Sequence, residues 1–169
     1  MRICLAQINT TPGDFSGNQA RVQLGIDKAS RENCDLVVFP ELCIPGYLSQ
    51  DLLYNPEYID RNLAVLEELV IASTQFSPRL HIIVGYVGRN VLSGKPFTNM
   101  AAVIKSGKVV GSYQKQLLPF YDVFDELRYF EPGTEALTFE IDSKKVGVAI
   151  CEDLWNDKSS DNYDKQNNP

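Results

Sequence analysis

The sequence predicts an α/β protein with a mixed β-sheet and helices packed on one side of it. Two strand–helix units open the chain, over residues 2–33 and 35–75, and two β-hairpins follow, over residues 97–115 and 136–151. Parallel strands need crossover helices, whereas hairpins add antiparallel strands, so this order of elements favours a mixed sheet. With 169 residues the chain is long enough to bury one hydrophobic core.

The first unit begins with residues 2–9, RICLAQIN, which read as a strand and are followed by turn residues at 11–14. Asn18 is suitably placed to cap a helix that runs to about Asn33. Apolar residues recur along this segment at helical spacing. We therefore expect an amphipathic helix that packs against the sheet.

The second unit repeats this order. Residues 35–40, DLVVFP, predict a buried strand that Pro40 terminates. A longer helix is expected from about Pro56 to Gln75, since proline suits the first turn of a helix. Residues 81–87, HIIVGYV, predict a third strand.

Turn residues mark the two hairpins. Ser106-Gly107 lies between the strands of the first hairpin, and Asp142-Ser143 lies between those of the second. Residues 146–150, VGVAI, form a short apolar run, as expected of a strand covered on both faces.

Composition excludes several classes of partner. The net charge is −6 and the basic residues are scattered, which argues against binding to nucleic acid or to an anionic membrane. No apolar run is long enough to span a bilayer. The cysteines form no CxxC pair, so we expect reduced thiols in a cytoplasmic protein and no metal site. They are Cys4, Cys34, Cys43 and Cys151.

Three reactive residues each follow a predicted strand: Glu41, Lys115 and Cys151. Residues at the ends of neighbouring strands converge on a common cleft in folds of this class. A carboxylate can accept the thiol proton, and an ammonium can stabilise the oxyanion of a tetrahedral intermediate. Taken singly, each residue also has an ordinary interpretation, as a solvated loop acid, a surface charge and a small buried hydrophobe.

The chain contains one histidine, His81, at the start of a predicted strand. We interpret it as structural, because a Cys–His pair would need a histidine placed at the end of a strand. A carboxylate is therefore the expected base.

Three segments resemble the signature segments of the carbon–nitrogen hydrolase, or nitrilase, superfamily, in the same order along the chain. They are FPELCIPGY (39–47), YQKQLLPFYDVFDELRYFEPG (113–133) and AICEDLW (149–155). Within them, PELCIPGYLSQDLLY, KQLLPFYDVFDELRYF and CEDLW are similar to the glutaminase domain of glutamine-dependent NAD synthetases. The resemblance implies a nitrilase-like α-β-β-α sandwich and a glutamine amidohydrolase.

Position by position, the resemblance implies that Glu41 is the general base, Lys115 the electrophilic stabiliser and Cys151 the nucleophile. Glu126 matches the family's auxiliary glutamate, which helps position the lysine and the substrate. The base passes a proton to the departing ammonia, and the acyl group stays on the cysteine as a thioester until water releases it.

The same resemblance implies substrate contacts for L-glutamine. Tyr121 and Phe124 fall where related domains contact the glutamine, and Glu152 matches a residue that receives its α-amino group. The backbone N–H of Glu152 is expected to join Lys115 in the oxyanion hole. For Tyr121 and Phe124, simple loop packing remains the alternative.

In the resembled synthetases the ammonia passes to a second domain, which uses ATP and Mg to amidate nicotinic acid adenine dinucleotide. The glutaminase step itself needs no metal or organic cofactor. Nothing in this chain resembles the ATP-binding loop of that domain. The resemblance therefore implies a synthetase domain as partner, together with assembly into a homo-oligomer.

Family members continue well beyond the cysteine strand. Residues 1–155 are accordingly expected to form a partial domain with one sheet face and one sheet edge exposed, and residues 156–169 a polar, disordered tail. Two other interpretations stay open. One is a stand-alone amidase or nitrilase of the same superfamily, and the other is an inactive truncated fragment that acts only through protein contacts.

Overall fold

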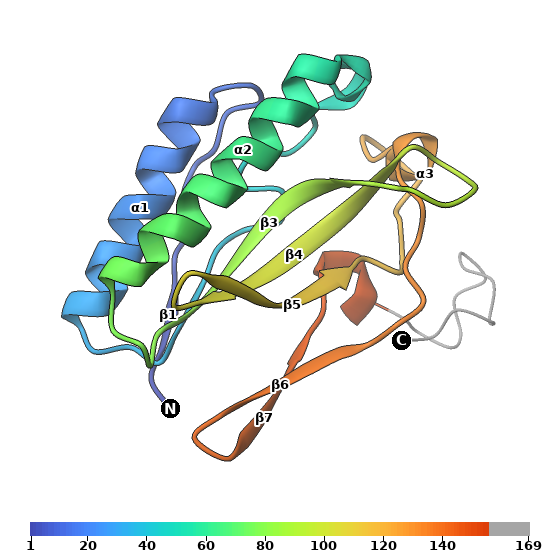
Figure 1. The fold of residues 1–169 in the computed structure, drawn as a ribbon. Helices are drawn as coiled ribbons and strands as arrows, with labels where there is room; N and C mark the ends of the chain where they lie inside the picture. The colour runs from blue at the N-terminus through green and yellow to red at the C-terminus, as the bar shows by residue number, and fades with distance from the viewer. Residues whose placement is uncertain (156–169) are drawn as a thin grey trace.

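The computed structural model describes residues 1–155, which form a layer of helices, a five-stranded sheet and a β-hairpin (Figure 1). The tail expected at residues 156–169 lies outside the described residues. The sheet has the order β1-β2-β3-β4-β5. Strands β1, β2 and β3 pair in parallel, whereas β4 pairs antiparallel with both of its neighbours, β3 and β5. The mixed sheet is thus confirmed. Its strands are β1 (Ile3–Leu5), β2 (Leu36–Val38), β3 (His81–Arg89), β4 (Phe97–Lys105) and β5 (Lys108–Gln114).

Two long helices, α1 (Phe15–Arg31) and α2 (Pro56–Ala72), cover one face of this sheet (Figure 1). Side chains alternate along each strand, so Ile82 belongs to the core beneath the helices and Ile83 belongs to the core on the opposite face. Both faces of β3 are therefore buried. The prediction that the helices share one side is confirmed.

The second predicted hairpin forms its own two-stranded sheet, β6 (Leu137–Ile141) and β7 (Lys144–Val148). It lies on the sheet face that the helices leave free, which gives the α-β-β part of a nitrilase-type sandwich (Figure 1). The expectation that residues 146–150 are covered on both faces was wrong. Val146 and Val148 pack toward the large sheet, whereas Gly147 has open space beside it, because no described residue covers the outer face of the hairpin.

The start of α1 also differs from the sequence prediction. Asp14, rather than Asn18, is the N-cap, and its Oδ1 accepts the N–H of Gly17 at 3.0 Å. Asn18 lies inside the helix, fully buried, and its amide donates to the carbonyls of Thr11 and Ile44. For α2, Asn55 is the N-cap and the predicted Pro56 is the first helical residue.

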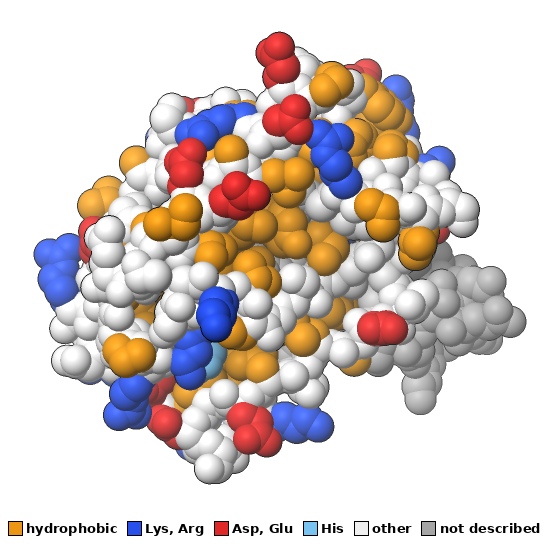
Figure 2. Space-filling model, in the orientation of Figure 1, with side chains coloured by type: hydrophobic (Ala, Val, Ile, Leu, Met, Phe, Trp, Pro, Cys, Tyr) orange, Lys and Arg blue, Asp and Glu red, His pale blue; other side chains and the backbone are white. Residues whose placement is uncertain are grey.

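Short helical turns complete the described residues: η1 (Gln50–Tyr54), η2 (Ser73–Gln75), α3 (Glu126–Tyr129) and η3 (Cys151–Leu154). Across residues 1–155, none of the helices has the length and apolar character needed to cross a bilayer. Hydrophobic side chains gather across the middle of the face shown in Figure 2. The edge strand β1 is also open to solvent, since Leu5 is 78% exposed.

Candidate active site

Glu41 is placed by the loop that leaves β2 and crosses β3 at Gly85. Ile44 donates its N–H to the Gly85 carbonyl at 3.1 Å. A Cβ at position 85 would lie 2.3 Å from the nitrogen of Leu42, so only glycine lets the loop come this close to the strand. Leu42 itself has a φ of 47°, a conformation that costs energy outside glycine and persists where the surroundings impose it. The loop therefore holds Glu41 rigidly above the sheet.

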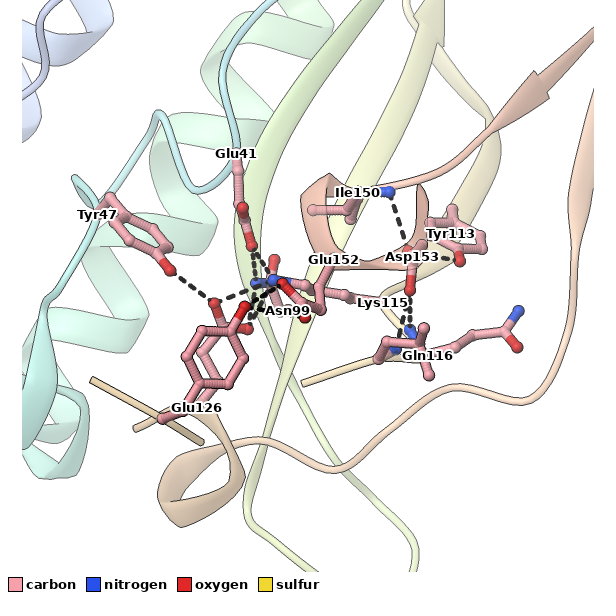
Figure 3. Close-up of polar contacts among 12 residues, drawn as sticks. Glu41, Tyr47, Asn99, Tyr113, Lys115, Gln116, Glu126, Ile150, Glu152 and Asp153 are labelled. Carbon is pink, nitrogen blue, oxygen red and sulfur yellow. Dashed lines mark hydrogen bonds and ion pairs between the residues drawn. The ribbon is translucent and has the colours of Figure 1, made fainter. Parts of the chain in front are cut away.

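Lys115 directly follows β5, and its backbone continues the pairing with β4. Its N–H donates to the Asn99 carbonyl at 2.9 Å, and its own carbonyl accepts the N–H of Gly133 at 2.9 Å. The side chain is fully buried. Its Nζ lies 2.6 Å from Glu41 Oε1 and 3.0 Å from each carboxylate oxygen of Glu126 (Figure 3). A single cation thus joins two carboxylates.

Glu126 begins α3 and is only 4% exposed. Besides Lys115, it accepts the hydroxyl of Tyr47 at 2.8 Å and the Asn99 amide at 3.3 Å (Figure 3). Burial raises the pKa of Glu126 and the Glu41 charge adds to this, while Lys115 and the hydrogen bond from Tyr47 act in the opposite direction. The protonated form of Glu126 is therefore favoured more than in an ordinary glutamate.

Burial lowers the pKa of Lys115, but the charges of Glu41 and Glu126 outweigh that effect and hold the pKa above its ordinary value. The lysine thus remains an ammonium in the buried site. A fixed positive charge of this kind suits the stabilisation of an oxyanion.

Cys151 follows β7 and begins η3, with a φ of 46°. It lines the same cleft as Glu41, a space of about 430 Å³ between the two sheets. Partial burial and then the Glu41 charge raise the pKa of the Cys151 thiol; Lys115 lowers it, and Glu152 and Glu126 raise it further. The resting residue is therefore a thiol, which has to lose its proton before it can attack.

The turn that carries Cys151 is tied to the Lys115 segment by the buried carboxylate of Asp153. Its Oδ2 accepts the Ile150 N–H at 2.9 Å and the Tyr113 hydroxyl at 2.7 Å (Figure 3). Its Oδ1 accepts two more N–H groups, from Gln116 at 3.1 Å and Leu117 at 2.8 Å. Four donors thus converge on one carboxylate, and they link the small sheet to the large one.

Glu152, beside the thiol, is paired with Tyr121. The Tyr121 hydroxyl lies 3.0 and 2.9 Å from the two carboxylate oxygens of Glu152, which is 7% exposed. That hydrogen bond is the main reason why the pKa of Tyr121 is raised. The Phe124 ring lies 5.7 Å from the ring of Tyr121 and 6.3 Å from that of Tyr47. An acidic side chain and aromatic rings therefore stand next to Cys151.

The structure brings Glu41, Lys115 and Glu126 into direct contact and places Cys151 on the cleft that Glu41 lines. His81 pairs with Leu36 at the other end of the strands, away from this cluster, in agreement with its structural interpretation. Sequence reasoning missed three polar residues of the site: Tyr47, Asn99 and Asp153. Tyr47 and Asp153 lie inside the recognised segments without an assigned role, and Asn99 is recognisable only from its place beside Lys115 in the β4–β5 hairpin.

The layered fold, together with an acid and a thiol that line one cleft and a lysine that contacts the acid, defines a hydrolytic enzyme of α/β architecture. The sequence profile described as "Carbon-nitrogen hydrolase" matches residues 2–167. The chain belongs to this family, which confirms the resemblance seen in the sequence.

Curated relatives point in the same direction. The glutamine-dependent NAD(+) synthetase of Thermotoga maritima is 40% identical over 92% of this chain, and that of Acinetobacter baylyi is 38% identical over 91%. The matched regions make up 26% and 27% of those proteins, so the chain spans about a quarter of their length.

Solved structures show the same fold. The glutamine-dependent NAD+ synthetase of Acinetobacter baumannii, in complex with ADP, matches with a TM-score of 0.82 at 35% identity, over 91% of this chain and 28% of that one. An amidase of the nitrilase superfamily from Nesterenkonia AN1 matches with a TM-score of 0.77 at 22% identity, over 92% of this chain and 57% of that one. At that identity the amidase shows the fold alone.

Proposed function

We propose that this chain carries the glutaminase function of a glutamine-dependent NAD synthetase and releases ammonia from L-glutamine through a cysteine thioester. The observation that carries the proposal is the buried ammonium of Lys115 between Glu41 and Glu126, with Glu41 lining the cleft that also holds Cys151. The similarity to NAD synthetases over nine-tenths of the chain supports this choice within the family.

In the proposed reaction, Cys151 Sγ attacks the side-chain amide carbon of glutamine while its proton passes to Glu41. The raised pKa of the thiol supports this step, because the thiolate has to be generated at the moment of attack. Lys115 and the backbone N–H of Glu152 then hold the negative oxygen of the tetrahedral intermediate. Glu41 returns the proton to the nitrogen, the C–N bond breaks, and ammonia leaves a glutamyl thioester on Cys151.

Water completes the cycle. Glu41 removes a proton from the water as its oxygen attacks the thioester carbon, and the C–S bond then breaks. The proton passes to the sulfur, which restores the thiol and releases glutamate. Cys151, Glu41 and Lys115 supply all the chemistry of these steps, with Glu126 holding the lysine, so no metal or organic cofactor has a role in them.

The choice of glutamine among amides rests on the pair formed by Tyr121 and Glu152. A carboxylate beside the nucleophile disfavours the thiolate unless a cation offsets it, and the α-ammonium of glutamine is such a cation. The Tyr121 hydroxyl holds Glu152 in place by contacting both of its oxygens. In this proposal Phe124 packs against the aliphatic part of the substrate.

The proposal extends to the surroundings of the site. Ammonia would pass to a synthetase (ATP-pyrophosphatase) domain of the kind present in the relatives, where ATP and Mg serve the amidation of nicotinic acid adenine dinucleotide. All four cysteines are free, which supports a cytoplasmic location. We also propose assembly into a homo-oligomer.

Covalent labelling tests the proposal directly. A diazoketone analogue of glutamine should add to Cys151 in the intact chain, detected by mass spectrometry, and should not add to the Cys151→Ala variant. L-Glutamine should protect the residue, whereas propionamide at the same concentration should not. Equal protection by both amides would favour the stand-alone amidase, and ammonia release that survives Cys151→Ala would overturn the assignment of the nucleophile.

A further inference from the structure

Asn99 contacts both carboxylates of the buried cluster. It lies on β4 and is fully buried, and its backbone carbonyl accepts the N–H of Lys115. Its Nδ2 donates to Glu41 Oε1 at 2.7 Å and lies 3.3 Å from Glu126 Oε2 (Figure 3). One amide group thus serves the two acids that share Lys115.

The carboxylates fix the orientation of this amide. With nitrogen and oxygen exchanged, the Asn99 carbonyl oxygen would face two negatively charged groups, which is repulsive. In the observed orientation, Asn99 Oδ1 is buried and has no hydrogen-bond partner among residues 1–155. Leaving a buried carbonyl without a donor destabilises the fold. The site therefore keeps the two hydrogen bonds that Asn99 Nδ2 donates, although Asn99 Oδ1 is left without a donor.

The two oxygens of Glu41 are unequal as a result. Oε1 accepts from Lys115 Nζ at 2.6 Å and from Asn99 Nδ2 at 2.7 Å. Oε2 accepts no hydrogen bond from any described residue, and the side chain retains 14% exposure on the cleft shared with Cys151. One oxygen is anchored, and the other is available to take a proton.

We propose that Asn99 is a positioning residue that anchors Glu41 through Oε1 and so leaves Oε2 directed to proton transfer with Cys151. The inference rests on the proposed roles of Glu41 and Cys151. Lys115 Nζ is shared between Glu41 and Glu126, and the Asn99 amide gives Oε1 of Glu41 a second donor. Without this amide, Lys115 alone would hold Glu41, and the carboxylate would be free to turn away from the cleft that Cys151 lines.

The test measures the rate of Cys151 alkylation by iodoacetamide at pH 7, in the full chain. The rate should depend on a Glu41 carboxylate that is held in place to accept the thiol proton. A hydrogen bond to a charged group is worth about 1.5–3 kcal/mol, so Asn99→Ala should slow the reaction by roughly tenfold to a hundredfold. In a Glu41→Gln background, Asn99→Ala should change the rate less than about twofold, because coupled residues are not additive.

Asn62 offers a matched control. It is equally buried, on α2, and its amide donates to the Val87 carbonyl at 2.7 Å and accepts the Val87 N–H at 3.1 Å. Asn62→Ala should lower the melting temperature and leave the alkylation rate of Cys151 in the folded chain unchanged. Asn99→Leu removes the donor together with the unsatisfied carbonyl at similar volume, so it provides a folded variant if Asn99→Ala is unstable.

An alkylation rate within about twofold of the parent chain in both Asn99→Ala and Asn99→Leu would overturn the inference. Full additivity of the Asn99 and Glu41 changes would overturn it as well. Because alkylation by iodoacetamide requires no hydrolysis of glutamine, these outcomes are separate from a failure of the proposed function.

Discussion

Lys115 Nζ lies 2.6 Å from Glu41 Oε1, although 74 positions separate the two residues in the chain. The same amine is 3.0 Å from both oxygens of Glu126. One buried cation therefore connects the loop after β2, the end of β5 and the start of α3. The groups proposed for catalysis are thus also part of what holds these segments together.

Lys115→Met should destabilise the fold by about 3–5 kcal/mol at pH 7, because it leaves Glu41 and Glu126 as buried carboxylates without a cation. Burial raises the pKa of Glu126, so the folded chain binds this proton more tightly than the unfolded chain does. Glu126 therefore destabilises the fold at a pH high enough to remove the proton, and it does not do so at a pH low enough to keep it protonated. The deficit should therefore be smaller at pH 5 than at pH 7. Urea unfolding at both values measures it, and Lys108→Met, at an exposed position on β5, should stay within about 0.5 kcal/mol of the parent chain.

Gly85→Ala should destabilise the chain by about 1–3 kcal/mol, because the new Cβ would lie 2.3 Å from the Leu42 nitrogen and push the Glu41 loop off the sheet. Gly147→Ala is the control, since a Cβ there has nothing within 4 Å. It should change the stability by less than about 0.5 kcal/mol. Thermal unfolding of both variants measures the difference, and similar losses in the two would contradict the close approach at Gly85.

Asp153→Asn should destabilise the chain more than Tyr113→Phe. The asparagine turns its NH2 group toward two of the four donors that the carboxylate accepts, and hydrogen bonds to charged groups are worth about 1.5–3 kcal/mol each. Tyr113→Phe removes one donor and leaves the three backbone N–H groups satisfied. Chemical unfolding should rank the two variants in this order, and the reverse order would show that Asp153 does not organise the turn.

Cys151 should be the first of the four cysteines to be alkylated in the folded chain, because it is exposed. Burial raises the pKa of Cys43 to about 12, so this residue should react last. The pKa of Cys151 is also raised, so its rate should still be climbing above about pH 8.5, the ordinary thiol value. Peptide mapping after timed alkylation gives both results; labelling of Cys43 ahead of Cys151 would place the reactive thiol elsewhere.

Local turn chemistry made the two hairpins predictable from the sequence. Ser106-Gly107 and Asp142-Ser143 all have positive φ angles, as two-residue hairpin turns require, and the structure pairs the strands on either side of them. The start of α1 was not predictable in this way. The sequence pattern places Asp14 in the preceding turn, and the buried hydrogen bonds of Asn18 depend on tertiary contacts that sequence periodicity does not reveal.

For the site, position at the ends of strands was enough to single out Glu41, Lys115 and Cys151. The residues that surround them were harder to find. Asn99 has no special sequence context, and its place beside Lys115 follows only from the register of β4 and β5. Asp153 accepts hydrogen bonds from backbone N–H groups on two segments. Because nearly every residue has such a group, the side chains of its partners give no sign of the contact in the sequence.

The thiol and the lysine belong to different sheets. Cys151 extends from the β6–β7 hairpin, whereas Glu41 and Lys115 are fixed to the strands of the larger sheet. In the proposed reaction the proton of Cys151 passes to Glu41, so the distance that it crosses is set by the spacing between the two sheets. The packing of the β6–β7 hairpin on the larger sheet therefore fixes the position of the sulfur relative to Glu41.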